Sequence, residues 1–260
     1  MEIPVIFEDN HLLAVIKPPN ILSQGDNSGD KDMLSILKEK IKTRDNKPGN
    51  VYLGLLHRLD RPVGGVMVFA KTSKSASRLS AQIREREFKK GYLAVVHGVP
   101  EKKKDILENY LLKNRKTNTV SVVDKGTEGA QKAVLDYEVL DYSDGYSLLK
   151  VNLHTGRPHQ IRVQLAAIGY PLYGDQRYGY RVNKKGQQIA LWSHTITCKH
   201  PIFNAELSFI SYPAKRGIWS KFELEQAGQG CTIFHEDWTP EQRNALSEKL
   251  IIIKKQKTST

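Results

Sequence analysis

Short apolar runs alternate with polar segments along the chain as far as residue 211, and their spacing predicts many strands and few helices. Strands are predicted at residues 5–7, 12–16, 51–56, 66–70, 88–98, 106–113, 129–140, 145–154, 189–198 and 205–211. Helices are predicted at residues 31–43, 73–83 and 158–168. Because strands and helices do not alternate strictly, we expect an α+β fold with a mixed, largely antiparallel sheet flanked by helices.

The pattern changes near the C-terminus. Residues 228–230 look like a break, and a helix is predicted from Thr239 to about Lys254, since Pro240 and Gln242 are typical of a helix start. We therefore expect a main domain over residues 1–227 and a helical extension with a basic tail over residues 228–260.

Composition narrows the possible classes of protein. The 260 residues include 39% hydrophobic and 26% charged side chains, enough to bury a core. No apolar run approaches the roughly 20 residues that cross a membrane, and no signal peptide is recognisable. Cys198 and Cys231 fit neither zinc spacing nor a disulfide framework, which favours a cytoplasmic protein without a metal site. The net charge of +12 suits a polyanionic partner.

The segment of residues 57–65 carries the clearest candidate chemistry. Asp60 stands between Arg58 and Arg61, in a polar loop that joins two apolar runs. Such a loop, held by two core strands, is a rigid place for a reactive carboxylate. The structural alternative is that Asp60 is only a salt-bridged turn residue.

Two further segments combine apolar patterning with functional side chains. Residues 153–165 pass from a strand into a helix, whose first N–H groups suit a phosphate, and they carry Arg157, His159 and Arg162. The structural alternative is a solvated amphipathic helix. In the strand of residues 88–98, Tyr92 has an equally simple explanation as a core residue.

These segments resemble the RluA-type pseudouridine synthases, and they occur in that family's order. Residues 56–71 look like its catalytic motif with Asp60 in the place of the essential Asp, although Val63 and Gly64 replace the usual Thr and Ser. The segment around Arg162 is similar to the family's Gly-Arg-x-His-Gln-Ile-Arg motif, whose last Arg pairs with that Asp. Tyr92 matches the Tyr that packs on the target base.

The resemblance extends from residue 3 to about residue 222. Lys17 and Pro18 match an early Lys-Pro pair that is structural and near the site, and residues 169–175 and 191–194 also follow the family's order. Many members carry a small RNA-binding module before the catalytic domain. Here we expect none, since the catalytic domain begins almost at Met1.

The resemblance implies a function. The protein is expected to isomerise specific uridines in ribosomal or transfer RNA to pseudouridine, without cofactor or metal, and to act as a monomer. Asp60, Tyr92 and Arg162 are the expected catalytic residues, with Arg162 holding Asp60 in its charged form. The expected RNA contacts are Arg58, Arg61, Lys90, Arg157, His159 and Gln160. Whether the Asp attacks the sugar, attacks the base or removes a proton is left open.

Three alternatives are kept beside this one. The first is a non-catalytic RNA-binding or RNA-remodelling protein of the same fold. The second is a nucleoside or glycoside hydrolase, which needs two carboxylates; only a distant residue such as Asp175 could supply the second. The third is a metal enzyme, for which His154 and His159 lack a third ligand at a convincing spacing.

Overall fold

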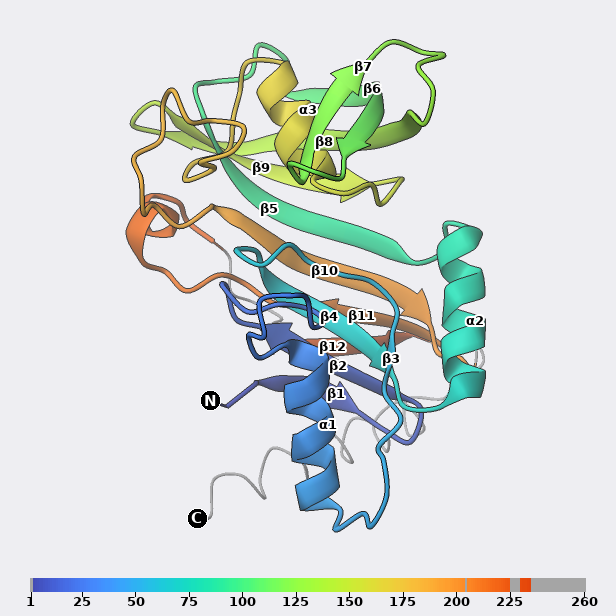
Figure 1. Ribbon diagram of the computed structural model, residues 1–260. Helices are drawn as coiled ribbons and strands as arrows, with labels where there is room; N and C mark the ends of the chain where they lie inside the picture. The colour runs from blue at the N-terminus through green and yellow to red at the C-terminus, as the bar shows by residue number, and fades with distance from the viewer. Residues whose placement is uncertain (1, 204, 225–229, 235–260) are drawn as a thin grey trace.

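The computed structural model describes residues 2–203, 205–224 and 230–234. Within them the chain forms a twelve-stranded sheet, with most strands in the order β1-β2-β4-β10-β5-β9-β8-β6-β7 (Figure 1). The strands are β1 (Val5–Glu8), β2 (Leu12–Lys17), β3 (Gly54–Leu55), β4 (Gly64–Ala70), β5 (Lys89–His97), β6 (Lys104–Asn114), β7 (Thr119–Val123), β8 (Gln131–Ser143), β9 (Tyr146–Leu153), β10 (Leu191–Lys199), β11 (Glu206–Ile210) and β12 (Gly230–Phe234). The helices are α1 (Met33–Arg44), α2 (Ser73–Arg84), α3 (Gln160–Ala167) and the 3₁₀ helix η1 (Gly217–Lys221).

The sheet is antiparallel except where β4 and β10 meet. These two strands run parallel, with Gly64 opposite Trp192 and Gly65 opposite Ser193. The other strand pairs of the described chain are antiparallel, including the long β5–β9 and β8–β9 ladders. The predicted α+β class with a mixed, largely antiparallel sheet is therefore confirmed.

Helices cover both faces of the sheet. Apolar side chains of α1 and α3 share one core cluster with inward-facing residues of the central strands, such as Leu37, Ile161 and Phe69. Leu79 of α2 packs in a second cluster on the opposite face, with Val66 and Phe209. Figure 1 shows α1 and α3 in front of the sheet and α2 at its right-hand end. The active-site candidates lie between the loop before β4 and the start of α3.

The helix starts differ in a way that matters for the site. Asp32 accepts the N–H of Ser35 at 3.1 Å at the start of α1, and Thr72 accepts that of Ser75 at 3.1 Å at the start of α2. Side-chain caps of this kind satisfy N–H groups that have no partner within the helix. At α3 the cap residue is His159, whose φ of 52° is left-handed and whose side chain makes no capping bond. The helix begins at Gln160, two residues later than predicted.

Two elements differ from the sequence prediction, whereas the basic, polar stretch 113–127 contains the expected hairpin, formed by β6 and β7. The apolar run 51–56 contributes only the two-residue strand β3, although Val51 and Leu53 are buried in the core. After the predicted break, β12 pairs with β11. The predicted helix from Thr239 lies outside the described residues, and the division into domains stays a prediction.

Candidate active site

The loop that carries Asp60 is fixed from below by Lys17 and Ser23. Lys17 is fully buried, and its Nζ donates to the carbonyl oxygens of Arg61 at 3.0 Å and Val63 at 2.7 Å. The Ser23 hydroxyl donates to the carbonyl of Leu59 at 2.8 Å and accepts its N–H at 3.0 Å. These bonds hold the backbone of the loop on both sides of Asp60.

The buried amine of Lys17 also bears on the charge of the site. Burial lowers its pKa to about 7, although the carboxylate of Asp60 acts in the opposite direction, and the charge of Arg61 lowers it further. The Lys-Pro pair is thus structural and near the site, as the resemblance implied.

The glycine pair after Pro62 lets two distant strands approach. A Cβ on Gly64 would lie 2.4 Å from Cζ3 of Trp192, and one on Gly65 would lie 2.2 Å from the carbonyl oxygen of Ser193. Gly65 also has a φ of +117°, which disfavours other residues. At position 64, where the family usually has Ser, this chain has Gly, and the ring of Trp192 occupies the space that a side chain would need.

Arg162 of α3 contacts two carboxylates at once. Its Nη1 donates to Asp60 Oδ2 at 2.8 Å, while Nε and Nη2 donate to the two oxygens of Asp175 at 2.8 and 2.9 Å. Six of the eight α3 residues are buried, so the alternative of a solvated amphipathic helix is wrong. Oδ1 of Asp60 accepts no hydrogen bond from the described residues, and the side chain stays 27% exposed. One carboxylate oxygen is thus held and the other is left open.

Asp175 was the distant acid that a hydrolase would need, and its surroundings do not suit that role. Burial alone would raise its pKa, but the hydrogen bonds and charge of Arg162, with the N–H groups of Arg177 and Tyr178, lower it overall. A general acid must hold a proton near neutral pH, so its pKa has to be raised instead. Asp175 also has a side-chain exposure of 0%, which leaves no room for water. The structure gives it the role of a second partner for Arg162.

Tyr92 projects from β5 into the same region. Its side chain is 6% exposed, and burial raises the pKa of its hydroxyl, with a further contribution from the charge of Asp60 and an opposing hydrogen bond with Ser193. The hydroxyl is therefore protonated at neutral pH in the free protein, where it can donate a hydrogen bond but cannot serve as a phenolate base.

His159 brings an imidazole beside the carboxylate. Its Nε2 lies 3.9 Å from Asp60 Oδ2, and its Nδ1 lies 2.7 Å from the hydroxyl of Tyr178. The guanidinium of Arg162 sits over the ring of Tyr178, with Cζ 5.2 Å from the ring centre. Burial lowers the pKa of His159, although Asp60 acts to raise it.

Three of the other predicted RNA contacts, Arg58, Arg61 and Lys90, differ in their exposure and in the groups beside them. Arg58 is exposed and makes no ion pair with the described residues, whereas Arg61 pairs with Asp30 at 2.7 Å on the surface. Lys90 is half-buried beside Gly156, where a Cβ would lie 3.2 Å from its Nζ.

Arg157 and Gln160 are used within the loop before α3. Arg157 Nε donates to the carbonyl of Lys132 at 2.9 Å. Gln160 is only 3% exposed, its Oε1 accepts from Thr155 at 2.8 Å and its Nε2 donates to Val134 at 3.1 Å. We therefore no longer expect Gln160 to contact RNA directly, because its amide is occupied in shaping the loop.

Several groups of the site were not assigned from sequence. Ser23, Tyr178 and the pairing role of Asp175 lack any local signal, since each acts on a residue far away in the chain. The sequence singles out Asp175 as a possible second carboxylate of a hydrolase, but gives no signal for its bond to Arg162. The position of Gly174 at φ +77°, with a Cβ only 2.2 Å from the Gln188 carbonyl, shows why that turn needs glycine.

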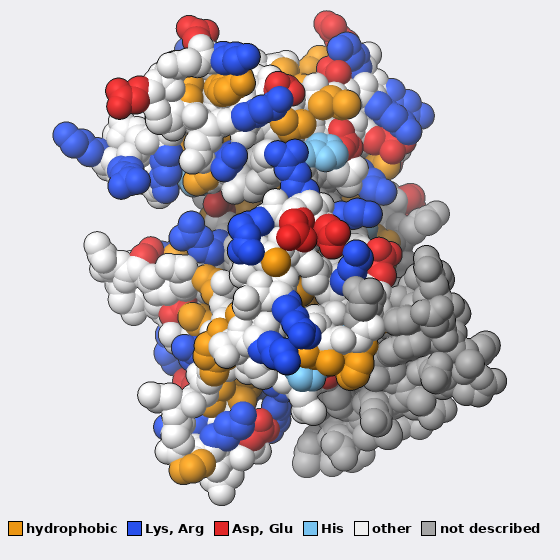
Figure 2. All heavy atoms as spheres, turned by 90° about the vertical axis from the view of Figure 1, so that its right-hand side faces the viewer, with side chains coloured by type: hydrophobic (Ala, Val, Ile, Leu, Met, Phe, Trp, Pro, Cys, Tyr) orange, Lys and Arg blue, Asp and Glu red, His pale blue; other side chains and the backbone are white. Residues whose placement is uncertain are grey.

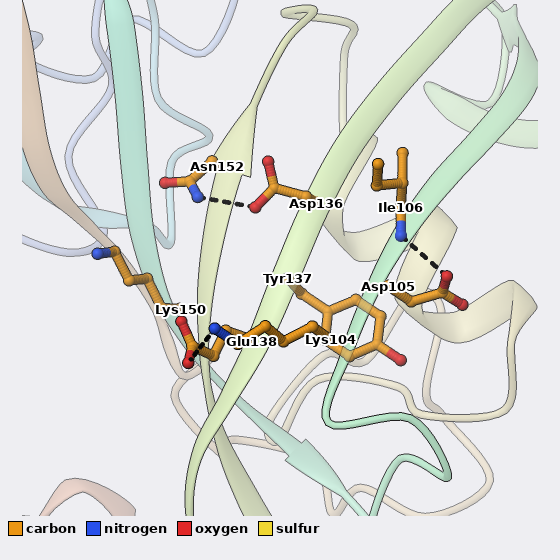
Figure 3. Close-up of a pocket in the computed structure, with 8 residues that line it drawn as sticks. All are labelled: Lys104, Asp105, Ile106, Asp136, Tyr137, Glu138, Lys150 and Asn152. Carbon is orange, nitrogen blue, oxygen red and sulfur yellow. Dashed lines mark hydrogen bonds and ion pairs between the residues drawn. The ribbon is translucent and has the colours of Figure 1, made fainter.

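A surface hollow on β6, β8 and β9 is a separate feature (Figure 3). Asp136, Glu138, Lys150 and Asn152 in its lining alternate along their strands with core residues that face α3. They therefore point away from Asp60. The two acids are already paired, Asp136 with Asn152 at 2.8 Å and Glu138 with Lys104 at 2.9 Å. Within the described ranges no cluster of His, Cys, Asp or Glu could hold a metal ion, and no helix is long and apolar enough to span a membrane.

Comparison with known proteins identifies the group to which this arrangement belongs. Residues 11–167 match the model of the RNA pseudouridylate synthase family. The chain belongs to this family. It is 33% identical over 229 residues to an uncharacterized RNA pseudouridine synthase of Aquifex aeolicus, covering 86% of this chain and 69% of that protein. It is 34% identical over 182 residues to the ribosomal large subunit pseudouridine synthase D of Pseudomonas aeruginosa, covering 70% of this chain and 55% of that protein.

Solved structures agree on the fold. The human RNA pseudouridylate synthase domain containing 4 protein superposes with a TM-score of 0.67 at 21% identity, over 81% of this chain and 89% of that chain. The human RNA pseudouridylate synthase domain containing 1 protein gives a TM-score of 0.66 at 19% identity, over 95% of both chains. The RluA-type resemblance and the pseudouridine synthase fold are confirmed, and with them the membership of an isomerase family.

Proposed function

We propose that this protein isomerises uridine to pseudouridine in structured RNA, with Asp60 as the reacting carboxylate. The observation that carries the proposal is the hydrogen bonding of Asp60: Arg162 holds Oδ2 at 2.8 Å, while no described residue bonds Oδ1. A carboxylate used only as a salt bridge would gain most from two bonds to the guanidinium fork. Here Asp175 accepts two hydrogen bonds from the guanidinium, and one oxygen of Asp60 stays open to a substrate.

The reaction needs few protein groups. The N1–C1′ bond of uridine breaks, the base turns, C5 bonds to C1′, the C5 proton leaves and N1 takes up a proton. The target nucleotide must leave its stack, which costs a few kcal/mol unless it already lies in a loop. We expect Tyr92 to pack on the extruded uracil and Arg58, exposed next to the site, to occupy the vacated stack or to contact a phosphate.

The surface charge supports an RNA substrate. Figure 2 shows Lys and Arg side chains over the upper part of the molecule, with Asp and Glu between them. The whole chain carries a net charge of +12, which favours a polyanion. Two of the relatives are named ribosomal large subunit pseudouridine synthases C and D, so we propose ribosomal RNA as the first substrate to examine and transfer RNA as the second. We also expect the protein to act as a monomer in the cytoplasm.

A non-catalytic RNA-remodelling protein would require different properties of the site. Such a protein has no use for a carboxylate with one open oxygen beside a polarising guanidinium. Its binding of RNA would be unaffected by the state of Asp60, and so would its effect in cells. The same variant therefore tests both functions.

The deciding experiment compares Asp60→Asn with wild type on RNA labelled with tritium at uridine C5. The RNA is total RNA from cells in which the gene is deleted. Asp60→Asn should release no tritium, while its affinity in filter binding stays within a few-fold, because phosphate contacts carry most of the affinity. Asp136→Asn, on the opposite face of the sheet, is the matched control. Turnover by Asp60→Asn would refute the proposed function, and mapping the sites lost in the deletion strain would name the uridine.

A further inference from the structure

His159 stands at the start of α3 in a conformation that its side chain does not use for capping. Its φ of 52° lies in the left-handed region, which residues other than glycine occupy rarely and at an energetic cost. The equivalent residues of the other two helices, Asp32 and Thr72, accept a backbone N–H with their side chains. The left-handed turn at His159 leaves the imidazole free to face Asp60 instead.

Two contacts at Tyr178 indicate which nitrogen of His159 carries the hydrogen. The N–H of Val120 donates to the Tyr178 hydroxyl at 2.9 Å, and the same hydroxyl lies 2.7 Å from His159 Nδ1. Among the described residues, Nδ1 is the acceptor that lies within reach of the hydroxyl hydrogen, which favours donation to Nδ1. A neutral imidazole that accepts at Nδ1 carries its hydrogen on Nε2.

The Nε2–H group faces Asp60 and has no acceptor among the described residues. It lies 3.9 Å from Asp60 Oδ2, which is too long for a hydrogen bond, and Arg162 already occupies that oxygen at 2.8 Å. The imidazole side chain is 9% exposed. An oriented N–H group without a partner beside the reacting carboxylate is available to a substrate atom.

The charges around His159 favour the neutral ring. Burial lowers its pKa most strongly; Asp60 from the catalytic loop acts to raise it, whereas the cations that face it lower it further. These cations are Arg162 of α3, Arg177 of the following loop and Lys113 of β6. The ring is therefore a neutral hydrogen-bond donor near neutral pH.

We propose that His159 is a catalytic residue that donates its Nε2–H to a carbonyl oxygen of the target uracil, and that Tyr178 is the positioning residue that orients it. The inference rests on the proposed function. When the N1–C1′ bond breaks, the uracil keeps the electron pair, and the negative charge spreads onto its carbonyl oxygens. A fixed N–H donor stabilises that charge as it develops. The pair returns when C5 bonds to C1′, so His159 transfers no proton.

The positioning of this donor depends on the hairpin of β6 and β7. Val120 lies in β7, and Arg177, next to Tyr178, donates to the carbonyl of Asn118 at the hairpin tip. The basic residues Lys113, Arg115 and Lys116 border the same tip. The orientation of His159 is thereby tied to a surface segment that is suited to RNA.

Four variants test the proposal with the C5-tritiated total RNA described above. His159→Asn keeps a residue that tolerates positive φ but is too short to reach the substrate. Tyr178→Phe keeps the ring beneath Arg162 and loses only the hydroxyl. The third variant combines the two. The matched control is Tyr180→Phe, because Tyr180 is 64% exposed.

We expect His159→Asn to lower the single-turnover rate about 10²-fold and Tyr178→Phe to lower it by less, while the RNA affinity of both variants stays within a few-fold of wild type.

The double variant separates positioning from a purely structural role. Because Tyr178 acts through His159, the double variant should be no slower than His159→Asn alone. The ratio of wild-type to His159→Asn rates should also stay constant from neutral to mildly alkaline pH, since the donor is already neutral.

Additive losses, or a ratio that falls as pH rises, would overturn the proposal, and so would a wild-type rate in His159→Asn. If thermal melts show that His159→Asn does not fold, a wild-type rate in Tyr178→Phe overturns it instead. Failure here with an inactive Asp60→Asn leaves the proposed function standing, whereas an active Asp60→Asn removes both.

Discussion

The six-membered ring of Trp192 fills the space that a side chain on Gly64 would need, since a Cβ there would lie 2.4 Å from its Cζ3. The two residues are opposite each other in the parallel pair of β4 and β10, directly after the catalytic loop. The contact explains why this chain carries Gly where similar motifs have Ser.

We predict that Gly64→Ser destabilises the protein by about 1–3 kcal/mol, the usual effect of overpacking a close contact. Combining it with Trp192→Leu should recover part of the loss, because the smaller side chain makes room for Ser. Gly49→Ser is the control, since nothing lies within 4 Å of a Cβ at that position. Urea unfolding measures all of these variants. Equal losses in Gly64→Ser with and without Trp192→Leu would show that the ring is not the obstacle.

Arg162→Lys should lower the single-turnover rate by at least about 10²-fold, with the fold intact. The guanidinium bonds Asp60 through one nitrogen and Asp175 through two, and a single ammonium cannot reproduce this planar arrangement. Tritium release under enzyme excess measures the rate, and circular dichroism checks the fold. A near-normal rate would show that the geometry of the pair does not matter for the reaction.

Tyr92→Phe should leave RNA affinity unchanged and slow the reaction by about 10²-fold. The ring can still pack on uracil, but the hydroxyl that lies near Asp60 and contacts Ser193 is lost. Since the pKa of Tyr92 is raised, the wild-type rate at neutral pH should not depend on a phenolate. Filter binding and tritium release separate the two effects, and identical rates for Tyr and Phe would eliminate any chemical role of the hydroxyl.

Acid should destabilise the protein partly through His57. Burial lowers its pKa from 6.5 to about 3, with a smaller contribution from the charge of Lys90, and its Nε2 accepts the N–H of Val68 at 3.1 Å. The unfolded chain therefore binds more protons than the folded one between these values, so stability falls as pH drops from 6.5 towards 3 and is unaffected by this group above 6.5.

The variant His57→Gln removes that titration and keeps an acceptor for Val68. The difference in urea midpoint between wild type and variant should therefore change between neutral pH and about pH 4, in favour of the variant at the acid end. Carboxylates that titrate in the same range are common to both proteins and cancel in the comparison. A difference independent of pH would show that His57 does not hold its neutral form in the fold.

Local patterns predicted most of the fold, and the failures have physical causes. The helix cap at Thr72 and the turn at Asp144 and Gly145 depend on adjacent residues, so the sequence predicts α2 and the β8–β9 hairpin with nearly correct bounds. The start of α3 was misplaced because His159 takes a left-handed conformation for which the sequence gives no signal. Strand β3 was predicted too long, since burial of Val51 and Leu53 does not require hydrogen bonding within the sheet.

The candidate site also combines contacts that the sequence predicts with contacts that it does not. The pairing of Arg162 with Asp60 came from a family resemblance, and the structure places the two side chains in contact across 102 positions of sequence. The second carboxylate on Arg162 was not predicted, because a bond between Asp175 and a residue 13 positions earlier depends on how the loop after α3 folds back. Gln160 lies in a motif whose neighbours face the site, yet its own side chain turns inward.

The parallel pairing of β4 and β10 has a consequence for synthesis of the protein in the cell. The catalytic loop leads into Gly64 and Gly65, whose neighbours in the sheet, Trp192 and Ser193, are made more than a hundred residues later. A ribosome therefore has to deliver nearly all of the described chain before the loop gains its final support. A truncated product that ends before β10 would lack the strand beside which the end of the catalytic loop is held.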